Sequence, residues 1–140
     1  MSKVSPKRQR LAEVPLFRAC SDDELSLLEK LADEVHVTAE ELLIQEGGIG
    51  HEFFVIAGGE ALVRRRGREV ARLGPGDFFG ELALLGEPVR DAEVVASTEM
   101  DVIVIGSRDF HTLLASAPSL TRAILRGTAR RLQEADLAQF

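Results

Sequence analysis

Glycine residues divide the middle of the chain, from 35 to 105, into short runs rich in β-branched and aromatic residues. These runs are 52–56, 61–64, 69–73, 93–96 and 101–105. Short strands at regular spacing with turn signals between them are typical of a sandwich, barrel or roll. The spacing leaves little room for helices in this part of the chain, so the centre of the fold is predicted to be β-structure.

Helical patterns flank this region on both sides. Ser21 followed by Glu24 is a capping-box pattern, and the leucines after it predict a helix over 22–34. Past Gly106 the helical spacing returns and predicts helices over about 107–117 and 119–138. The expected fold is α+β, mainly β: a β-roll (a double-stranded β-helix, jelly-roll-like) with one N-terminal helix and two C-terminal helices.

Composition narrows the class of protein. The chain has 140 residues, one cysteine and a net charge of −6. We therefore expect one domain over 14–140 after a basic, flexible tail over 1–13, with no internal disulfide. An acidic domain is a poor match to a nucleic-acid backbone. No apolar run approaches the ~20 residues of a membrane span, and the start lacks a signal core, so we expect a cytoplasmic protein.

The segment 76–96 carries the chemistry. Gly80 allows a ligand close to the backbone, and residues 81–85 form at most a short helix before Gly86 and Pro88 stop it. The free N–H groups of such a turn can bind an anion, and Arg90 adds a fork of charged donors. Glu81 can accept hydrogen bonds from a hydroxyl group. The segment thus offers hydrogen-bond donors for an anion next to an acceptor for a hydroxyl group, and a ribose phosphate needs both.

Phe79-Gly-Glu-Leu-Ala-Leu-Leu85, followed by Arg90, resembles the phosphate-binding cassette of cyclic-nucleotide-binding domains. These domains occur in cAMP-dependent protein kinase regulatory subunits, cyclic-nucleotide-gated channels and catabolite activators. The similarity extends over roughly 14–138, through Val14-Pro-Leu-Phe17, Phe54-Val-Ile-Ala-Gly-Gly-Glu60 and Leu73-Gly-Pro-Gly-Asp-Phe78.

The resemblance implies a role for each matched position. Glu81 would accept from the ribose 2′-hydroxyl, and Arg90 would pair with the cyclic phosphate. The remaining ligand-binding positions would be Gly80 and the backbone N–H groups of Leu82, Ala83 and Ala92. The family resemblance implies a stand-alone sensor that binds cAMP, with cGMP weaker because no threonine stands where cGMP-selective members tend to place one. No catalysis, cofactor or metal is expected. The signal would leave through the C-terminal helix, to an effector protein or a second copy.

Asp91 and Glu93 depart from the family, which often has small residues around the arginine and, in the kinase proteins, serine or threonine three places after it. A carboxylate facing the phosphate would weaken binding. Neighbouring strand positions alternate between faces, so at least one of the two is expected to point away. These acids support one alternative, a degenerate domain that acts as an interaction module.

Two further alternatives remain open. A transcription regulator of the catabolite activator type needs a DNA-binding domain, which the chain lacks before Phe140 unless it is a fragment of a longer protein. A metal enzyme of the cupin type needs clustered histidines, but His36, His51 and His111 are scattered. We expect the arginines at 64, 65, 66 and 68 to form a solvated hairpin tip, and Cys20 to be a small packed residue.

Overall fold

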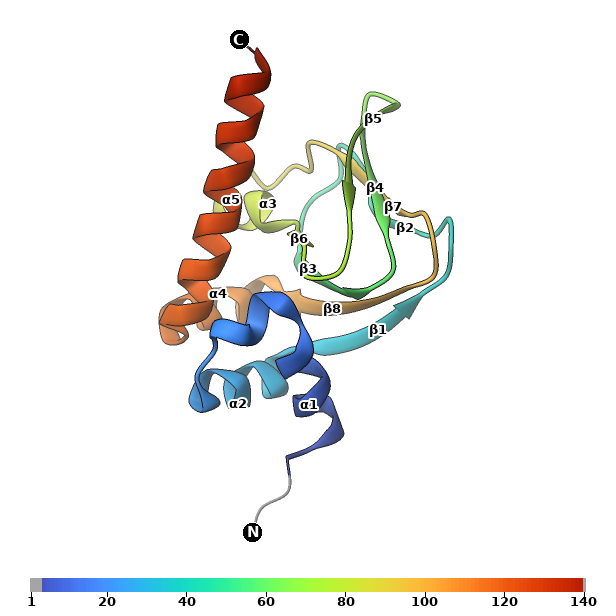
Figure 1. The fold of residues 1–140 in the computed structure, drawn as a ribbon. Coiled ribbons are helices and arrows are strands. Elements are labelled where there is room, and N and C mark those ends of the chain that lie inside the picture. Colours follow the sequence, from blue (N-terminus) through green and yellow to red (C-terminus); the bar gives the residue numbers. More distant parts are fainter. Residues whose placement is uncertain (1–3, 140) are drawn as a thin grey trace. The chain divides into compact units, whose positions relative to one another are not determined.

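The computed structural model describes residues 4–139, and the side chains of residues 4–134. The chain divides into a roll unit, Leu31–Phe110, and a helical unit, which joins the residues up to Lys30 with those from His111 onward. Figure 1 labels α1–α5 and β1–β8, which are numbered in chain order. All strands of the described chain belong to the roll unit.

The roll unit contains two antiparallel four-stranded sheets, ordered β1-β8-β3-β6 and β2-β7-β4-β5. The strands of the first sheet are β1 (Asp33–Val37), β8 (Met100–Gly106), β3 (Glu52–Gly58) and β6 (Phe78–Phe79). Those of the second are β2 (Leu42–Ile44), β7 (Glu93–Ala96), β4 (Ala61–Arg65) and β5 (Arg68–Leu73). Apart from the β4–β5 hairpin, consecutive strands lie in different sheets, which is the pattern of a jelly roll. The predicted fold class is confirmed.

The core of the roll unit joins side chains from both sheets. It contains Val37, Ile44, Phe54, Ile56, Ala61, Phe79, Val94, Ala96, Met100, Val102 and Val104. On the other face of β3, Phe53 is also fully buried, with its ring centroid 4.7 Å from that of Phe110 and 5.7 Å from that of Phe78. Because β3 is covered on both faces, its sequence is a continuous apolar run rather than an alternating one.

The β4–β5 hairpin turns through two residues. Arg65 pairs with Arg68, and between them Arg66 and Gly67 have φ values of 53° and 77°. Two successive positive φ angles are the mark of a tight hairpin turn whose twist matches that of the strands. The hairpin tip predicted at 66–68 is therefore confirmed.

The helical unit contains α1 (Pro6–Glu13), the 3-10 helix η1 (Pro15–Ala19), α2 (Asp22–Leu31) up to Lys30, and α5 (Pro118–Gln139). The helix α4 (Ser107–Ser116) begins in the roll unit and continues into the helical unit. α5 packs against η1. Among the described residues, the buried apolar side chains of the helical unit are Leu11, Val14, Phe17, Leu28, Leu113, Ala117, Leu120 and Ile124.

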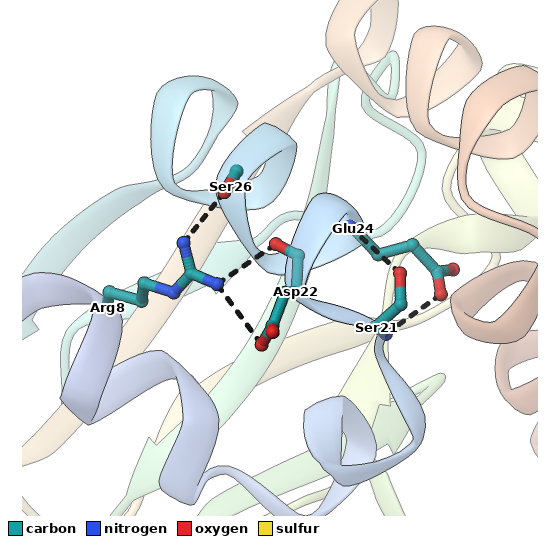
Figure 2. A network of polar contacts seen from close by, with 5 residues as sticks. All are labelled: Arg8, Ser21, Asp22, Glu24 and Ser26. Carbon is teal, nitrogen blue, oxygen red and sulfur yellow. Dashed lines mark hydrogen bonds and ion pairs between the residues drawn. The ribbon is translucent and has the colours of Figure 1, made fainter. Parts of the chain in front are cut away.

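Glu24 is a buried carboxylate, 5% exposed, that joins the first turns of two helices. Its Oε1 accepts from the N–H of Ser21 at 3.0 Å, and its own N–H donates to Ser21 Oγ at 3.2 Å (Figure 2). Its Oε2 accepts from the N–H groups of Ser119 (2.9 Å) and Leu120 (3.2 Å) in the first turn of α5. Burial acts to raise the pKa of Glu24, but the hydrogen bonds prevail and lower it to about 2. The predicted capping box is confirmed.

The structure differs from the sequence prediction at two places near the N-terminus. Residues 6–13 form α1 rather than a flexible tail, because Ser5 caps the helix, Leu11 is buried, and Arg8 reaches α2. Arg8 donates to Ser26 Oγ at 2.7 Å and to the carbonyl of Asp22 at 3.0 Å (Figure 2). Residues 1–3 of the predicted tail lie outside the described residues. The helix predicted over 22–34 ends at Leu31, and its last residues pass into β1.

The two C-terminal helices appear where they were predicted, as α4 and α5. No helix in the described part of the chain is both long enough and apolar enough to cross a lipid bilayer.

Candidate functional site

The segment 76–96 forms β6, the one-turn helix α3 (Glu81–Leu85) and β7, all within the roll unit. Gly80 is the N-cap of α3, with φ of +95°, a conformation that favours glycine. Gly80 has no side chain, so no side-chain cap occupies the first N–H groups of α3. The short helix thus presents backbone donors beside a position where a ligand can approach closely.

Arg90 is a buried cation, 8% exposed. Its Nη1 donates to the carbonyl of Gly80 and its Nη2 to the carbonyl of Glu52, both at 2.7 Å. Burial lowers the pKa of Arg90, against the carboxylates of Glu52, Glu81 and Asp91, which raise it. A guanidinium carries five N–H donors, so Arg90 can hold both carbonyls and still donate to an anion.

The loop 47–50 holds the backbone of Arg90 in place. The N–H of Arg90 donates to the carbonyl of Gly48 at 2.7 Å, and its carbonyl accepts from the N–H of Gly47 at 2.8 Å. A Cβ at Gly50 would lie 2.5 Å from the Cβ of Ala83 and 2.7 Å from Cζ of Arg90. The loop, α3 and the guanidinium are therefore packed so closely that Gly50 accepts no side chain.

The sequence-predicted site residues gather around this guanidinium. Glu81 is 2% exposed, with Oε2 fully buried, and its charge acts on Arg90. Ala83 and Ala92 are buried as well, whereas Leu82 is exposed. The predicted roles of Leu82, Ala83 and Ala92 use their backbone N–H groups and do not depend on where the side chains point.

Asp91 and Glu93 alternate in burial with their neighbours. Arg90, Ala92 and Val94 are buried, whereas Asp91 is exposed and Glu93 half-buried. β7 begins at Glu93, so within the strand Glu93 points to the face opposite the buried Val94. Both are paired with β4: Arg65 Nη2 lies 3.4 Å from Asp91 Oδ2, and Arg64 Nη1 lies 3.6 Å from Glu93 Oε2.

The hairpin arginines are exposed or half-buried, as predicted for a solvated tip, and two of them also pair with these acids. Arg64 lies directly opposite Glu93 in the β4–β7 register, so the cross-strand pair follows from strand pairing. The carbonyl of Glu52, the second partner of Arg90, was also missed by sequence reasoning. No sequence signal marks a backbone carbonyl as a partner, and the register of β4 against β7 cannot be deduced from the two segments alone.

His36 and Cys20 are two further candidate residues from the sequence. His36 Nδ1 lies 3.0 Å from Asp101 Oδ1, and this hydrogen bond raises the pKa of His36. Within residues 4–134, no three His, Cys, Asp or Glu side chains gather as a metal-binding group. Burial, with a smaller effect of Glu24, raises the pKa of Cys20 to about 11, so its thiol is protonated at neutral pH.

Comparison with protein families matches residues 34–117 to the family described as "Cyclic nucleotide-binding domain". The match covers more than half of the chain and includes all of the segment 76–96. The chain therefore belongs to the cyclic nucleotide-binding domain family, and the resemblance suggested by the sequence is confirmed.

Relatives of the chain come from several kinds of protein. It is 37% identical over 114 residues to a cAMP-dependent protein kinase regulatory subunit of Neurospora crassa, covering 80% of this chain and 30% of that protein. It is 32% identical over 129 residues to the cGMP-dependent protein kinase egl-4 of Caenorhabditis elegans, covering 87% of this chain and 16% of that protein. The chain thus spans 30% or less of the length of these two relatives.

Among solved structures, the Thermus thermophilus Catabolite Activator Protein is similar, with a TM-score of 0.78 and 29% identity. The match covers 89% of this chain and 61% of that one.

Proposed function

We propose that this chain is a sensor module that binds cAMP, and cGMP more weakly, and acts by binding rather than catalysis. The observation that carries the proposal is the buried Arg90, held beside the glycine-capped turn of α3 with donors to spare. Membership of the family supports a cyclic nucleotide as the ligand. The preference for cAMP rests on the absence of the threonine that cGMP-selective members tend to have.

Each part of the ligand has a proposed partner in the site. The cyclic phosphate pairs with Arg90 and accepts from the backbone N–H groups of Leu82, Ala83 and Ala92. The ribose 2′-hydroxyl donates to the carboxylate of Glu81. Gly80 lets the sugar-phosphate approach the backbone. A Cβ there would also lie 2.8 Å from the carbonyl of Glu52, so the contacts that hold Arg90 require glycine as well.

Calorimetric titration of the chain with cAMP and cGMP tests this proposal. Arg90→Ala removes a charge-assisted contact worth about 1.5–3 kcal/mol, so cAMP should bind at least tenfold more weakly. Arg90→Lys keeps the positive charge but loses the paired N–H donors of the guanidinium. Its affinity for cAMP should therefore lie between that of the wild type and that of Arg90→Ala. An Arg90→Ala protein that is folded by circular dichroism and binds cAMP as tightly as the wild type would rule out this phosphate site.

The acids at 91 and 93 no longer favour a degenerate interaction module. Asp91 is exposed and Glu93 half-buried, unlike the buried Arg90, and each acid is paired with an arginine of β4. The feature that supported the alternative is therefore compatible with an intact phosphate site.

We further propose that the signal leaves through α5, to an effector protein or a second copy of the chain in the cytoplasm. α5 is well buried only in its first turns, at Leu120 and Ile124, whereas no side chain from 125 to 134 is buried. Gly127 lies within the continuous helix α5 and costs it about 1 kcal/mol of stability relative to alanine. Docking of the later turns is thus marginal, and a ligand that contacts the docked helix shifts its population.

Hydrogen exchange with and without cAMP tests this switch. Amides of 119–138 should gain protection together with those of 80–92. By reciprocity, deletion of 126–140 should weaken cAMP binding although that segment does not supply the phosphate contacts. Protection restricted to 80–92 would mean that the domain binds passively.

A further inference from the structure

We propose that Arg65 is a positioning residue for the nucleotide site, which fixes the backbone next to Arg90 and compensates the charge of Asp91. The inference rests on the cyclic-nucleotide function proposed above. Nothing in the cassette motif points to it, because Arg65 belongs to β4 and its partner replaces a residue that is often small in the family.

The contact between Arg65 and Asp91 has two parts. Nε of Arg65 lies 3.2 Å from the backbone carbonyl of Asp91, and Nη2 lies 3.4 Å from its Oδ2. One arginine therefore holds both the main chain and the side chain of the residue directly after Arg90. This places the end of β4 in contact with the point where the chain leaves the phosphate arginine.

The same hairpin also holds the loop on the other side of Arg90. The backbone N–H of Arg66 donates to Oε1 of Glu46 at 3.1 Å. The next residue, Gly47, donates its N–H to the carbonyl of Arg90 at 2.8 Å. The β4–β5 hairpin thus contacts both segments next to Arg90, the residue after it (Asp91) and the loop at Glu46–Gly47. These contacts limit how far the two segments can separate.

Charge gives Arg65 a second role. The carboxylate of Asp91 acts on the guanidinium of Arg90, with a smaller effect than those of Glu52 and Glu81. A negative charge beside the phosphate arginine disfavours an anionic ligand. Arg65 places a positive charge on that carboxylate, and so lets an acid occupy position 91 without loss of binding.

The size of the effect follows from exposure. The side chains of Arg65 and Asp91 are 52% and 68% exposed, and exposed ion pairs contribute little and are screened by salt. We therefore expect a change in affinity of about 2- to 5-fold at low ionic strength. The change should be smaller at high ionic strength, where the ion pair is screened and the hydrogen bond to the backbone carbonyl remains.

A double-mutant cycle on cAMP affinity tests the proposal, with calorimetry at ~20 mM and ~500 mM salt. Arg65→Ala should weaken binding about 2- to 5-fold at low salt. Asp91→Ala should leave affinity unchanged or slightly tighter. The double variant should lie between the two single variants, because it loses the contact of Arg65 with the backbone carbonyl of residue 91 but no longer has a carboxylate to compensate. Arg65→Lys keeps the charge but loses the fork, and should recover part of the affinity.

The matched control is Arg68→Ala. Arg68 lies across the hairpin from Arg65 in the β4–β5 register, and its replacement removes the same charge from the same hairpin. Equal losses for Arg65→Ala and Arg68→Ala, or a double variant as weak as Arg65→Ala, would overturn the inference. So would a folded Arg65→Ala protein with wild-type affinity at low salt. A wild-type chain that binds no cyclic nucleotide would overturn the proposed function and this inference together.

Discussion

Replacing Glu24 with glutamine should destabilise the protein by about 1.5–3 kcal/mol at neutral pH. The carboxylate accepts from the N–H groups of Ser21, Ser119 and Leu120, and it is 5% exposed. A glutamine of the same size loses the charge and turns an NH₂ group toward backbone donors. The first turns of α2 and α5 then lose their shared acceptor, and at least one buried N–H is left without one.

The pH dependence of this effect has a definite sign. Burial raises the pKa of Glu24, but the hydrogen bonds outweigh it and lower the pKa from 4.5 to about 2. At 1.36 kcal/mol per pKa unit, a shift from 4.5 to about 2 corresponds to about 3–4 kcal/mol as an upper limit. Because the folded state favours the charged form, this contribution is complete above pH 4.5 and is lost as the pH falls toward 2.

Urea unfolding at a series of pH values measures the difference between the wild type and Glu24→Gln. The difference in the free energy of unfolding should be largest at pH 7 and should shrink toward zero near pH 2. Asp23→Asn is the matched control, because it removes an exposed charge from the same helical turn and should change stability by less than about 0.5 kcal/mol. A Glu24→Gln difference that is absent at pH 7, or constant with pH, would refute the reasoning.

Two further substitutions test the geometry of the site. Gly80→Ala should destabilise the protein by about 1–3 kcal/mol in chemical denaturation and should weaken cAMP binding. The reason is that the φ of Gly80 is +95° and that the new Cβ would lie 3.0 Å from Nη1 of Arg90. Wild-type stability of this variant would show that the close approach is relieved. Glu93→Thr should leave cAMP affinity within about twofold of the wild-type value, because Glu93 lies on the strand face opposite the buried Val94 and pairs with Arg64. Tighter binding of cAMP by this variant in a titration would place the acid in the pocket.

Elements with strong local signals were predictable from the sequence. β3 and β8 are apolar runs, the β4–β5 turn contains glycine, and the capping box at Ser21 is short-range. The elements that were missed lack such signals. β1 is a mostly exposed strand at the edge of its sheet, with two acidic residues among its five, and β6 has only two residues. α1 has a single buried residue, Leu11, so contacts with distant residues rather than its own pattern hold it in place.

In the site, too, residues with a local sequence signal were predictable and contacts with distant residues were not. The cassette motif is contiguous, so Gly80, Glu81 and Arg90 could be found in one stretch of sequence. The partners that hold Arg90 come from elsewhere in the chain, and one of them, the carbonyl of Glu52, is a backbone atom 38 positions away. The pairing of Arg65 with Asp91 depends on the register of β4 against β7, which only the folded roll defines.

The most direct test of nucleotide binding at this site is the hydrogen exchange of individual amides in the wild type and in Arg90→Ala, each with and without saturating cAMP. The structure predicts that cAMP protects the amides of 80–92 in the wild type, with the N–H groups of Leu82, Ala83 and Ala92 among them. At the same cAMP concentration, Arg90→Ala should show little of this protection. Protection elsewhere but not in 80–92, or equal protection in both proteins, would contradict a phosphate site built on Arg90.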